Sequence, residues 1–219
     1  MSTLLPSVRV RTRLRLSLLA MLGGVAQVAF CAHADPRTAS VDEVREVHSR
    51  IASVFANRDD FPEAPVSMSR LEKKLYWSGS GSDALLLLPL TVRFRGVSNS
   101  YCRLVTANSK SGELALIPLP AQANFDDCSG IDQIRYVDVN GDGLLDVIET
   151  VKVKSNVQQG QVATSLVYVS SPLRAGGYCY SDAASRQLAP VDMKNDASVA
   201  KALESAKQRL GIVQFDCDH

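Results

Sequence analysis

The segment of this sequence best suited to chemistry is a twelve-residue acidic stretch, Asp138 to Glu149, which reads Asp-Val-Asn-Gly-Asp-Gly-Leu-Leu-Asp-Val-Ile-Glu. Side chains with oxygen atoms occupy positions 1, 3, 5, 9 and 12 of this stretch, and glycine occupies position 6. Calcium takes six to eight hard oxygen ligands. A spacing of two residues lets Asp138, Asn140 and Asp142 all turn inward as the backbone curls around an ion, and Gly143 permits the positive φ of a sharp turn. The stretch therefore predicts a calcium-binding loop.

The remaining ligands would come from the second half of the loop. The main-chain carbonyl of Leu144 would face the ion, Asp146 would bind directly or through water, and Glu149 could close the shell with both oxygens. Four carboxylates within twelve residues would repel one another in a folded loop that held no cation. The alternative is an ordinary acidic turn between two strands, for which a single Asn-Gly or Asp-Gly pair suffices.

The stretch resembles the calcium loops of FG-GAP and VCBS repeats, in the form Asp-Val-Asn-Gly-Asp-Gly-Leu-Leu-Asp-Val-Ile, and it also matches the twelve-residue loop of EF-hands. Tyr136-Val137 before the loop and Val147 to Val153 after it are typical of strands and favour the first family, because an EF-hand has a helix on each side. The resemblance covers twelve residues of 219 and implies calcium binding but little about function. FG-GAP proteins repeat the unit to build a propeller, whereas this chain has one copy. In the strand-flanked form Glu149 is usually not a ligand, so its role stays open.

Motifs for enzyme chemistry are weak in the rest of the chain. Gly79 to Ala84 fits a loose dinucleotide fingerprint, but an apolar run with Pro89 follows it where a helix would be needed. The adjacent carboxylates Asp59-Asp60 and Asp126-Asp127 could do acid–base work, although neighbouring acids in loops are more often solvated. The sequence contains no nucleophile elbow, zinc-binding helix motif or phosphate loop. It assigns no catalytic residue and leaves open whether the protein is an enzyme.

The first 34 residues are typical of an export signal. Four arginines between positions 9 and 15 form a basic segment, Leu16 to Phe30 is largely apolar, and Ala32-His33-Ala34 has the small-x-small pattern of a cleavage site. We expect a Sec-type signal peptide cleaved after Ala34 and a periplasmic or secreted mature protein. Two alternatives are a retained membrane anchor, for which the apolar run is short, and lipidation at Cys31, for which Phe30 is an unfavourable neighbour.

Charge and cysteine content agree with an exported domain. Of 24 basic and 23 acidic residues, the signal segment removes four arginines and no acid, which leaves 185 residues with a net charge of −3. Such a balance argues against a nucleic-acid partner, which usually meets a basic face. Four cysteines remain, and an even count in an oxidising compartment predicts two disulfides. We favour Cys102–Cys128 and Cys179–Cys217, because each pair closes a loop within its own half of the chain. A thiol metal site or a catalytic cysteine is the alternative.

Hydrophobic periodicity predicts a helix at each end of the mature chain and strands between them. Residues 40–56 carry an apolar stripe at helical spacing after a capping box of Ser40 and Glu43, and residues 196–210 predict a last helix. Strands are expected at 84–94, 101–106, 113–117, 131–137, 147–153 and 162–169. Pro89 predicts that the first of these is an edge strand or contains a bulge. The predicted fold class is α+β, mainly antiparallel β-sheet, in one disulfide-stabilised domain spanning residues 35–219.

Three functions are compatible with these features. The first is a binding or structural module in which Ca²⁺ staples a β-hairpin loop. The second is a periplasmic inhibitor, such as an immunity protein against a cell-wall-targeting toxin, since such proteins are small, exported and free of catalytic motifs. The third is a calcium-dependent hydrolase that uses two carboxylates. The expected partner is another periplasmic or secreted protein, with no nucleic acid and no membrane span after signal cleavage.

Overall fold

The computed structural model describes residues 37–55, 65–69, 75–98, 100–120, 128–154, 160–189, 191–210, 215 and 217 of the chain. The predicted signal segment, residues 1–34, and the acidic pairs Asp59-Asp60 and Asp126-Asp127 lie outside the described residues. None of the helices in the described part has the length and apolar character that crossing a membrane requires.

The described residues form two antiparallel sheets. The first sheet has the strand order β1-β3-β4-β5-β6, with β2 also paired to β4: β1 (Arg37–Thr38), β2 (Pro65–Ser69), β3 (Tyr76–Ser78), β4 (Leu85–Phe94), β5 (Ser100–Asn108) and β6 (Leu114–Leu116). The second sheet has the order β10-β9-β8-β7: β7 (Cys128–Val137), β8 (Asp146–Lys154), β9 (Gln161–Ser170) and β10 (Tyr178–Tyr180). Each predicted strand overlaps one of these, with residues 84, 113 and 117 lying just outside the observed bounds, while β1, β2, β3 and β10 were not predicted.

Within the described part of the chain, three α-helices cover the outer faces of the sheets. Helix α1 (Val41–Arg50) begins at the predicted capping box, in which Ser40 and Glu43 bond reciprocally, and it continues as the 3₁₀ turn η1 (Ile51–Val54). Helix α3 (Asp196–Leu210) has the predicted bounds, and the amide of Ser198 donates to the Asn195 side chain at its start. Helix α2 (Asp182–Leu188) was not predicted, and the Ser181 hydroxyl caps its first turn.

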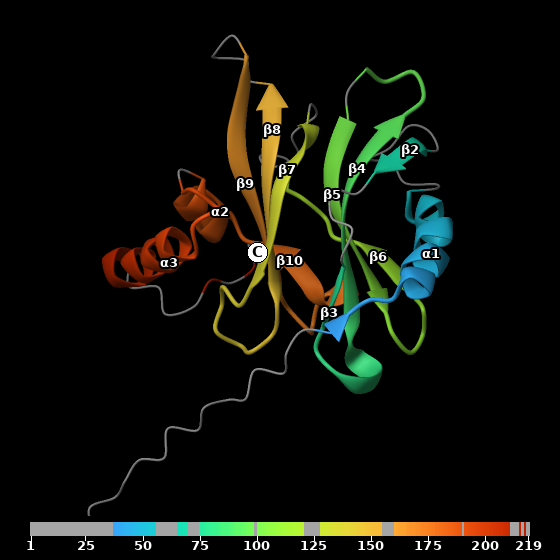
Figure 1. Cartoon of the computed structure of the whole chain (residues 1–219), viewed down its shortest axis with the longest axis horizontal. Helices are drawn as coiled ribbons and strands as arrows, with labels where there is room; N and C mark the ends of the chain where they lie inside the picture. The colour runs from blue at the N-terminus through green and yellow to red at the C-terminus, as the bar shows by residue number, and fades with distance from the viewer. Residues whose placement is uncertain are drawn as a thin grey trace, which may run out of the picture. The chain divides into compact units, whose positions relative to one another are not determined.

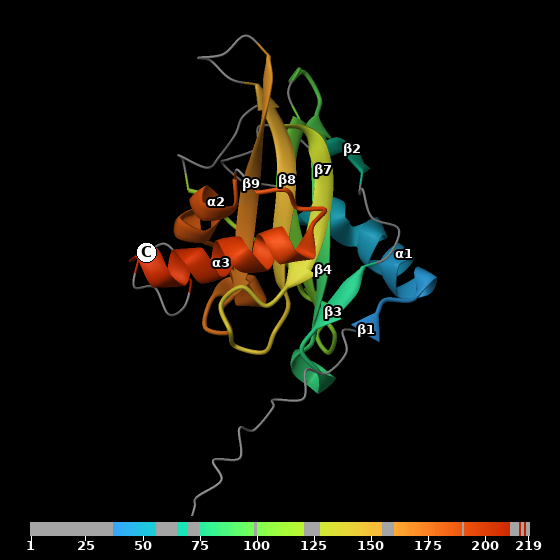
Figure 2. The same cartoon turned by 60° about the vertical axis from the view of Figure 1, so that its left-hand side comes forward.

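The sheets and helices stack in four layers (Figures 1 and 2). Alternate residues of a strand point to opposite faces, so Leu86 and Leu88 of β4 pack with α1 while Leu87 between them faces the second sheet. On the outer face of the second sheet, side chains of β8 and β9 pack with α2 and α3 through residues that include Leu188 and Leu203. The expected α+β class, mainly antiparallel, is confirmed.

Pro89 corrects one prediction, because β4 is an internal strand of its sheet with no register shift against β5. Pro89 lies opposite Leu104, whose carbonyl accepts from Ile117 on the far side of β5. This makes Pro89–Leu104 a non-hydrogen-bonded pair, so the missing N–H of Pro89 would point away from β5. On that side β3 pairs only as far as Leu86 and β2 only from Thr91, so no described strand needs the donor.

Both predicted disulfides are confirmed. Cys102–Cys128 joins β5 to β7 and so links the two sheets, with 5.7 Å between the Cα atoms. Cys179–Cys217 joins β10 to the segment after α3, with 5.5 Å between the Cα atoms. Each bridge would stabilise the fold by about 2–4 kcal/mol, chiefly through the unfolded chain.

Gly176 also ties the two sheets together. The connection from β9 to β10 contains the 3₁₀ turn η4 (Ala175–Gly177), and the Gly176 carbonyl accepts a 2.9 Å hydrogen bond from Thr106 of β5. A methyl group on Gly176 would lie 2.7 Å from the Cβ of Ala115 and 2.8 Å from the Cδ1 of Ile117. Glycine at this position therefore lets the main chain of the second sheet press against the first.

Gly176→Ala should destabilise the protein by more than Gly96→Ala does. Both residues have left-handed φ values, +78° and +73°, and so carry a similar backbone penalty of about 1 kcal/mol. A methyl on Gly96 meets nothing within 4 Å, whereas one on Gly176 overpacks the junction and should cost a further ~1–3 kcal/mol. Urea unfolding midpoints measure the difference, and equal losses in the two variants would contradict the tight contact.

Candidate calcium-binding loop

The acidic stretch forms the connection between β7 and β8, and Val137 pairs with Asp146 at its base. It is therefore flanked by strands, as the residues on either side predict. Figures 1 and 2 place it at the same end of the domain as the connection from β3 to β4. Gly141 and Gly143 adopt φ values of +80° and +84°, which are strained for other residues, and these two glycines turn the chain back.

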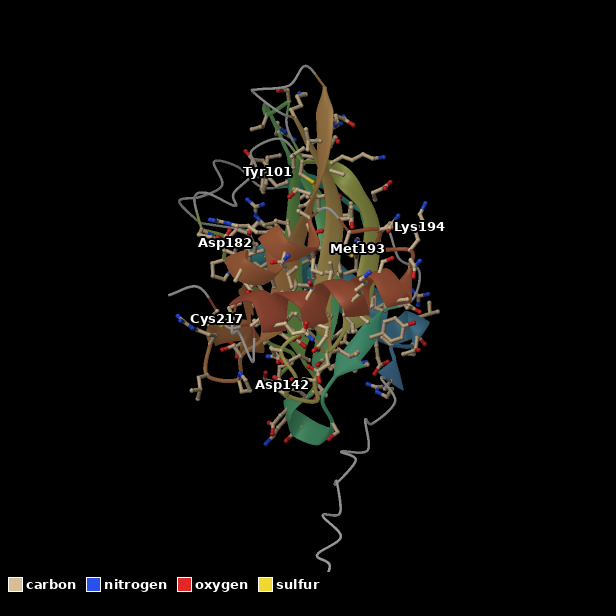
Figure 3. All side chains as sticks on the ribbon, turned by 90° about the vertical axis from the view of Figure 1, so that its left-hand side faces the viewer. Tyr101, Asp142, Asp182, Met193, Lys194 and Cys217 are labelled. Atoms are coloured by element: carbon tan, nitrogen blue, oxygen red, sulfur yellow. A yellow bond between two sulfur atoms is a disulfide. The ribbon has the colours of Figure 1, made fainter. Side chains whose placement is uncertain are left out.

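The side chains at loop positions 1, 3 and 5 are held by the loop's own backbone. The two carboxylate oxygens of Asp138 accept hydrogen bonds of 2.6 and 2.9 Å from the amides of Gly141 and Gly143. The Asn140 amide oxygen accepts from the Asp142 N–H at 3.1 Å, and Asp142 accepts from the Leu144 N–H at 2.8 Å. The backbone therefore wraps around these oxygens, while Asp142 itself stays exposed at the tip labelled in Figure 3.

Asp146 lies at the base of the loop and is fully buried. One carboxylate oxygen accepts from the amides of Val139 and Asn140, at 2.6 and 3.1 Å, and the other accepts from the amide of Ser170 at 2.7 Å. Burial raises the pKa of Asp146 to about 7, while these three hydrogen bonds act in the opposite direction and the charge of Asp142 adds to the increase. Asp146 thus anchors both ends of the loop to the end of β9.

Ser170 is a site residue that the sequence interpretation missed. Its amide donates to Asp146, its hydroxyl donates to Asp142, and both its carbonyl and its hydroxyl oxygen accept from the Asn140 side chain, at 3.3 and 3.1 Å. The register of two predicted strands could have revealed it. When Val147 pairs with Tyr168, as in β8 and β9, Ser170 comes to lie beside the base of the loop.

Leu144 and Leu145 connect the loop to the first sheet. The Leu145 amide donates to the Ser78 hydroxyl at 3.1 Å, and the Leu145 carbonyl accepts from the hydroxyl groups of Ser78 and Tyr178. Burial raises the pKa of Tyr178 above its ordinary value, which keeps its hydroxyl protonated as a donor. The second half of the loop is therefore fixed between β3 and β10.

Glu149 lies within β8, away from the loop tip, and its side chain faces the core between the sheets together with those of Val147 and Val151. It is fully buried, and among the described residues neither of its oxygens has a hydrogen-bond partner. The hydroxyl of Tyr168, also in this core, is likewise buried and unpaired among those residues. Burial raises the pKa of Glu149 to about 8, and the attraction of Arg103 only partly offsets this.

The structure also bears on the expected metal chemistry and on the weak enzyme motif at Gly79 to Ala84. In the described part of the chain, no three side chains of histidine, cysteine, aspartate or glutamate lie close enough together to hold a metal ion. The loop carboxylates are each engaged with main-chain N–H groups instead. Gly79 to Ala84, the loose dinucleotide fingerprint, forms the short turn η2 (Gly81–Asp83) and leads into β4, with no helix where the fingerprint needs one. Comparisons with protein-family models, curated proteins and solved structures find no match to the chain.

The stability of the protein should fall as pH rises from about 5 to about 8, in part because of Glu149. Between its ordinary pKa of 4.5 and about 8, the folded protein holds a proton on Glu149 that the unfolded chain releases. Glu149→Gln removes this titration while keeping the shape. The stability of wild type relative to the variant should therefore decline by at most about 1.4 kcal/mol per pH unit.

Urea unfolding with a chelator present, at several pH values across this window, measures the difference. The pKa of Asp146 in the folded protein is also raised, so its titration changes the stability with pH. This change is the same in wild type and variant and cancels in the comparison. Parallel stability curves for wild type and variant would show that Glu149 is ionised in the folded core.

Proposed function

We propose that this protein is an exported calcium-binding module in which one Ca²⁺ staples the loop between β7 and β8. The observation that carries the proposal is the way the backbone wraps around Asp138, whose two oxygens accept from the amides at loop positions 4 and 6. An ordinary hairpin turn needs no such convergence on its first carboxylate. The flanking strands support the same assignment, because they match the strand-flanked form of the motif.

The proposed ligands are the side chains of Asp138, Asn140 and Asp142, the carbonyl of Leu144, and Asp146. A carboxylate has about four lone-pair sites. The three hydrogen bonds to Asp146 leave one site, on the oxygen that accepts from Ser170, for a cation or a bridging water. We leave Glu149 out of the ligand set because its side chain faces the core between the sheets. Water would supply the rest of a shell of six to eight oxygens.

An inhibitor function is the second candidate, and one surface feature favours it. Leu173, in the connection from β9 to β10, is 100% exposed, so an apolar side chain is available to contact a partner protein. A hydrolase lacks a comparable observation. The fully buried carboxylates Asp146 and Glu149 serve the loop base and the core between the sheets. Asp83 and Glu113 line a cleft beside the acidic loop, and both are exposed.

Calcium should raise the melting temperature of the protein, and Asp138→Ala or Asp142→Ala should abolish the effect. Extracellular calcium sites bind at about 10⁻⁴–10⁻³ M. At tenfold excess over such a constant the ion adds about 1.4 kcal/mol, so the shift should be a few degrees. Magnesium should substitute poorly because it prefers a smaller octahedral shell.

Two further variants sharpen this test. Asp132→Asn removes an exposed carboxylate of β7 that pairs with Lys152, outside the loop, and should leave the calcium effect intact. Glu149→Gln should reduce the calcium affinity only slightly, whereas a loop that closed as in an EF-hand would lose most of its affinity. Identical melting curves with millimolar calcium and with chelator would leave the loop as an acidic turn.

A further inference from the structure

A cleft of about 690 Å³ opens beside the acidic loop, where connections from both sheets meet. One wall comes from the first sheet and includes Gly79, Asp83 and Glu113. The opposite wall comes from the second sheet and includes Leu144 of the acidic loop and Pro172. The volume is within the range of about 300–1,000 Å³ that ligand sites occupy.

The charge of this cleft has one sign. Its lining contains the carboxylates of Asp83 and Glu113 and no lysine, arginine or histidine. Neither carboxylate forms an ion pair with another described residue. Lys110 and Arg174 neighbour lining residues in the chain but are not part of the lining, and Arg50 donates to the carbonyl of Gly112, which is also outside the lining. A cation that entered would therefore find two carboxylates ready to accept it.

The rim of the cleft carries the exposed leucine. Pro172 and Ala175 to Gly177 line the cleft, while Leu173 between them is fully exposed. The packing of Gly176 against Ala115 holds this connection against the first sheet. An apolar side chain is thus presented on a fixed segment next to an acidic cavity.

We propose that the cleft binds a basic side chain of a partner protein segment, with a neighbouring apolar side chain of that segment packed on Leu173. Asp83 and Glu113 would receive the lysine or arginine head group in charge-assisted hydrogen bonds, and Leu85, Leu144 and Pro172 would contact its aliphatic stem. This site lies beyond the calcium function and does not depend on it.

The observations favour a protein segment over other cationic or polymeric ligands. The acidic lining repels the phosphates of nucleic acids. A free polyamine would satisfy Asp83 and Glu113 but would leave Leu173 exposed. A peptide that combines a basic and an apolar side chain matches both features.

The test uses three probes on the isotope-labelled protein, followed by the chemical shifts of its amides. The first probe is the acetylated pentapeptide amide Gly-Leu-Arg-Leu-Gly, the second replaces its arginine with glutamine, and the third is spermidine. The arginine peptide should shift the amide signals of Gly79, Glu113 and Gly176 and should bind at least about tenfold more tightly than either other probe. Raising the salt from about 50 to about 500 mM should weaken it severalfold.

Variants locate the binding. Asp83→Asn with Glu113→Gln should weaken the arginine peptide about tenfold, Leu173→Ser should weaken it by a smaller factor, and the matched surface variant Asp132→Asn should leave it unchanged. Equal binding of the arginine and glutamine peptides, binding of spermidine as tight as that of the arginine peptide, shifts confined to other surfaces, or no shifts at all would each overturn the proposal. Signals of Gly141 and Gly143 report calcium separately, so failure of either site is distinguishable from failure of the other.

Discussion

The structure around the acidic loop depends on the burial of one carboxylate, that of Asp146. A buried polar group without hydrogen-bond partners is costly. Asp146 accepts from three main-chain donors, two at the start of the loop and one at the end of β9, and these offset the cost. The loop must therefore return so that the amides of Val139 and Asn140 reach it, and β9 must extend to Ser170. The same bonds fix the register of Val137 opposite Asp146 and the position of the Ser170 hydroxyl beside Asp142.

The arrangement of the cleft follows from this anchor. Once Asp146 fixes the loop base, Leu145 lies where Ser78 of the first sheet and Tyr178 of the second both reach its carbonyl, and Leu144 becomes part of a wall. The Gly176 carbonyl makes an equivalent link, because it accepts from Thr106 across the sheet interface. Loops from two sheets thus meet at one end of the domain through hydrogen bonds from side-chain hydroxyl groups to main-chain carbonyls. These bonds give the surface that the loops form a rigid support.

Much of the fold could be predicted because its determinants are local. The capping box of α1, the bounds of α3 and the strands after the loop each depend on residues a few positions apart, and separation along the chain sufficed to pair the cysteines. Ser170 and Pro89 could not be assigned from local pattern. The contacts of Ser170 come from strand register, and Pro89 is tolerated only because β2 and β3 leave a gap beside it. The orientation of Glu149 could not be assigned from local pattern either. Its spacing matches that of a calcium ligand, but spacing alone does not show that its side chain faces the core between the sheets.

The loop and the cleft share Leu144, and this has a thermodynamic consequence for the two proposals taken together. Asp146 closes the loop base through main-chain donors, so calcium would act mainly at the tip, where Asp138 and Asp142 carry their charges. The Leu144 carbonyl would bind the ion while its side chain lines the cleft. If a ligand in the cleft favours one position of Leu144, it changes the calcium affinity through that residue. Calcium must then change the affinity of the cleft for its ligand by the same factor, because coupling between two binding equilibria is reciprocal. The Leu145 hydrogen bonds to Ser78 and Tyr178 restrict that movement, so the coupling should be small and each site should function largely without the other.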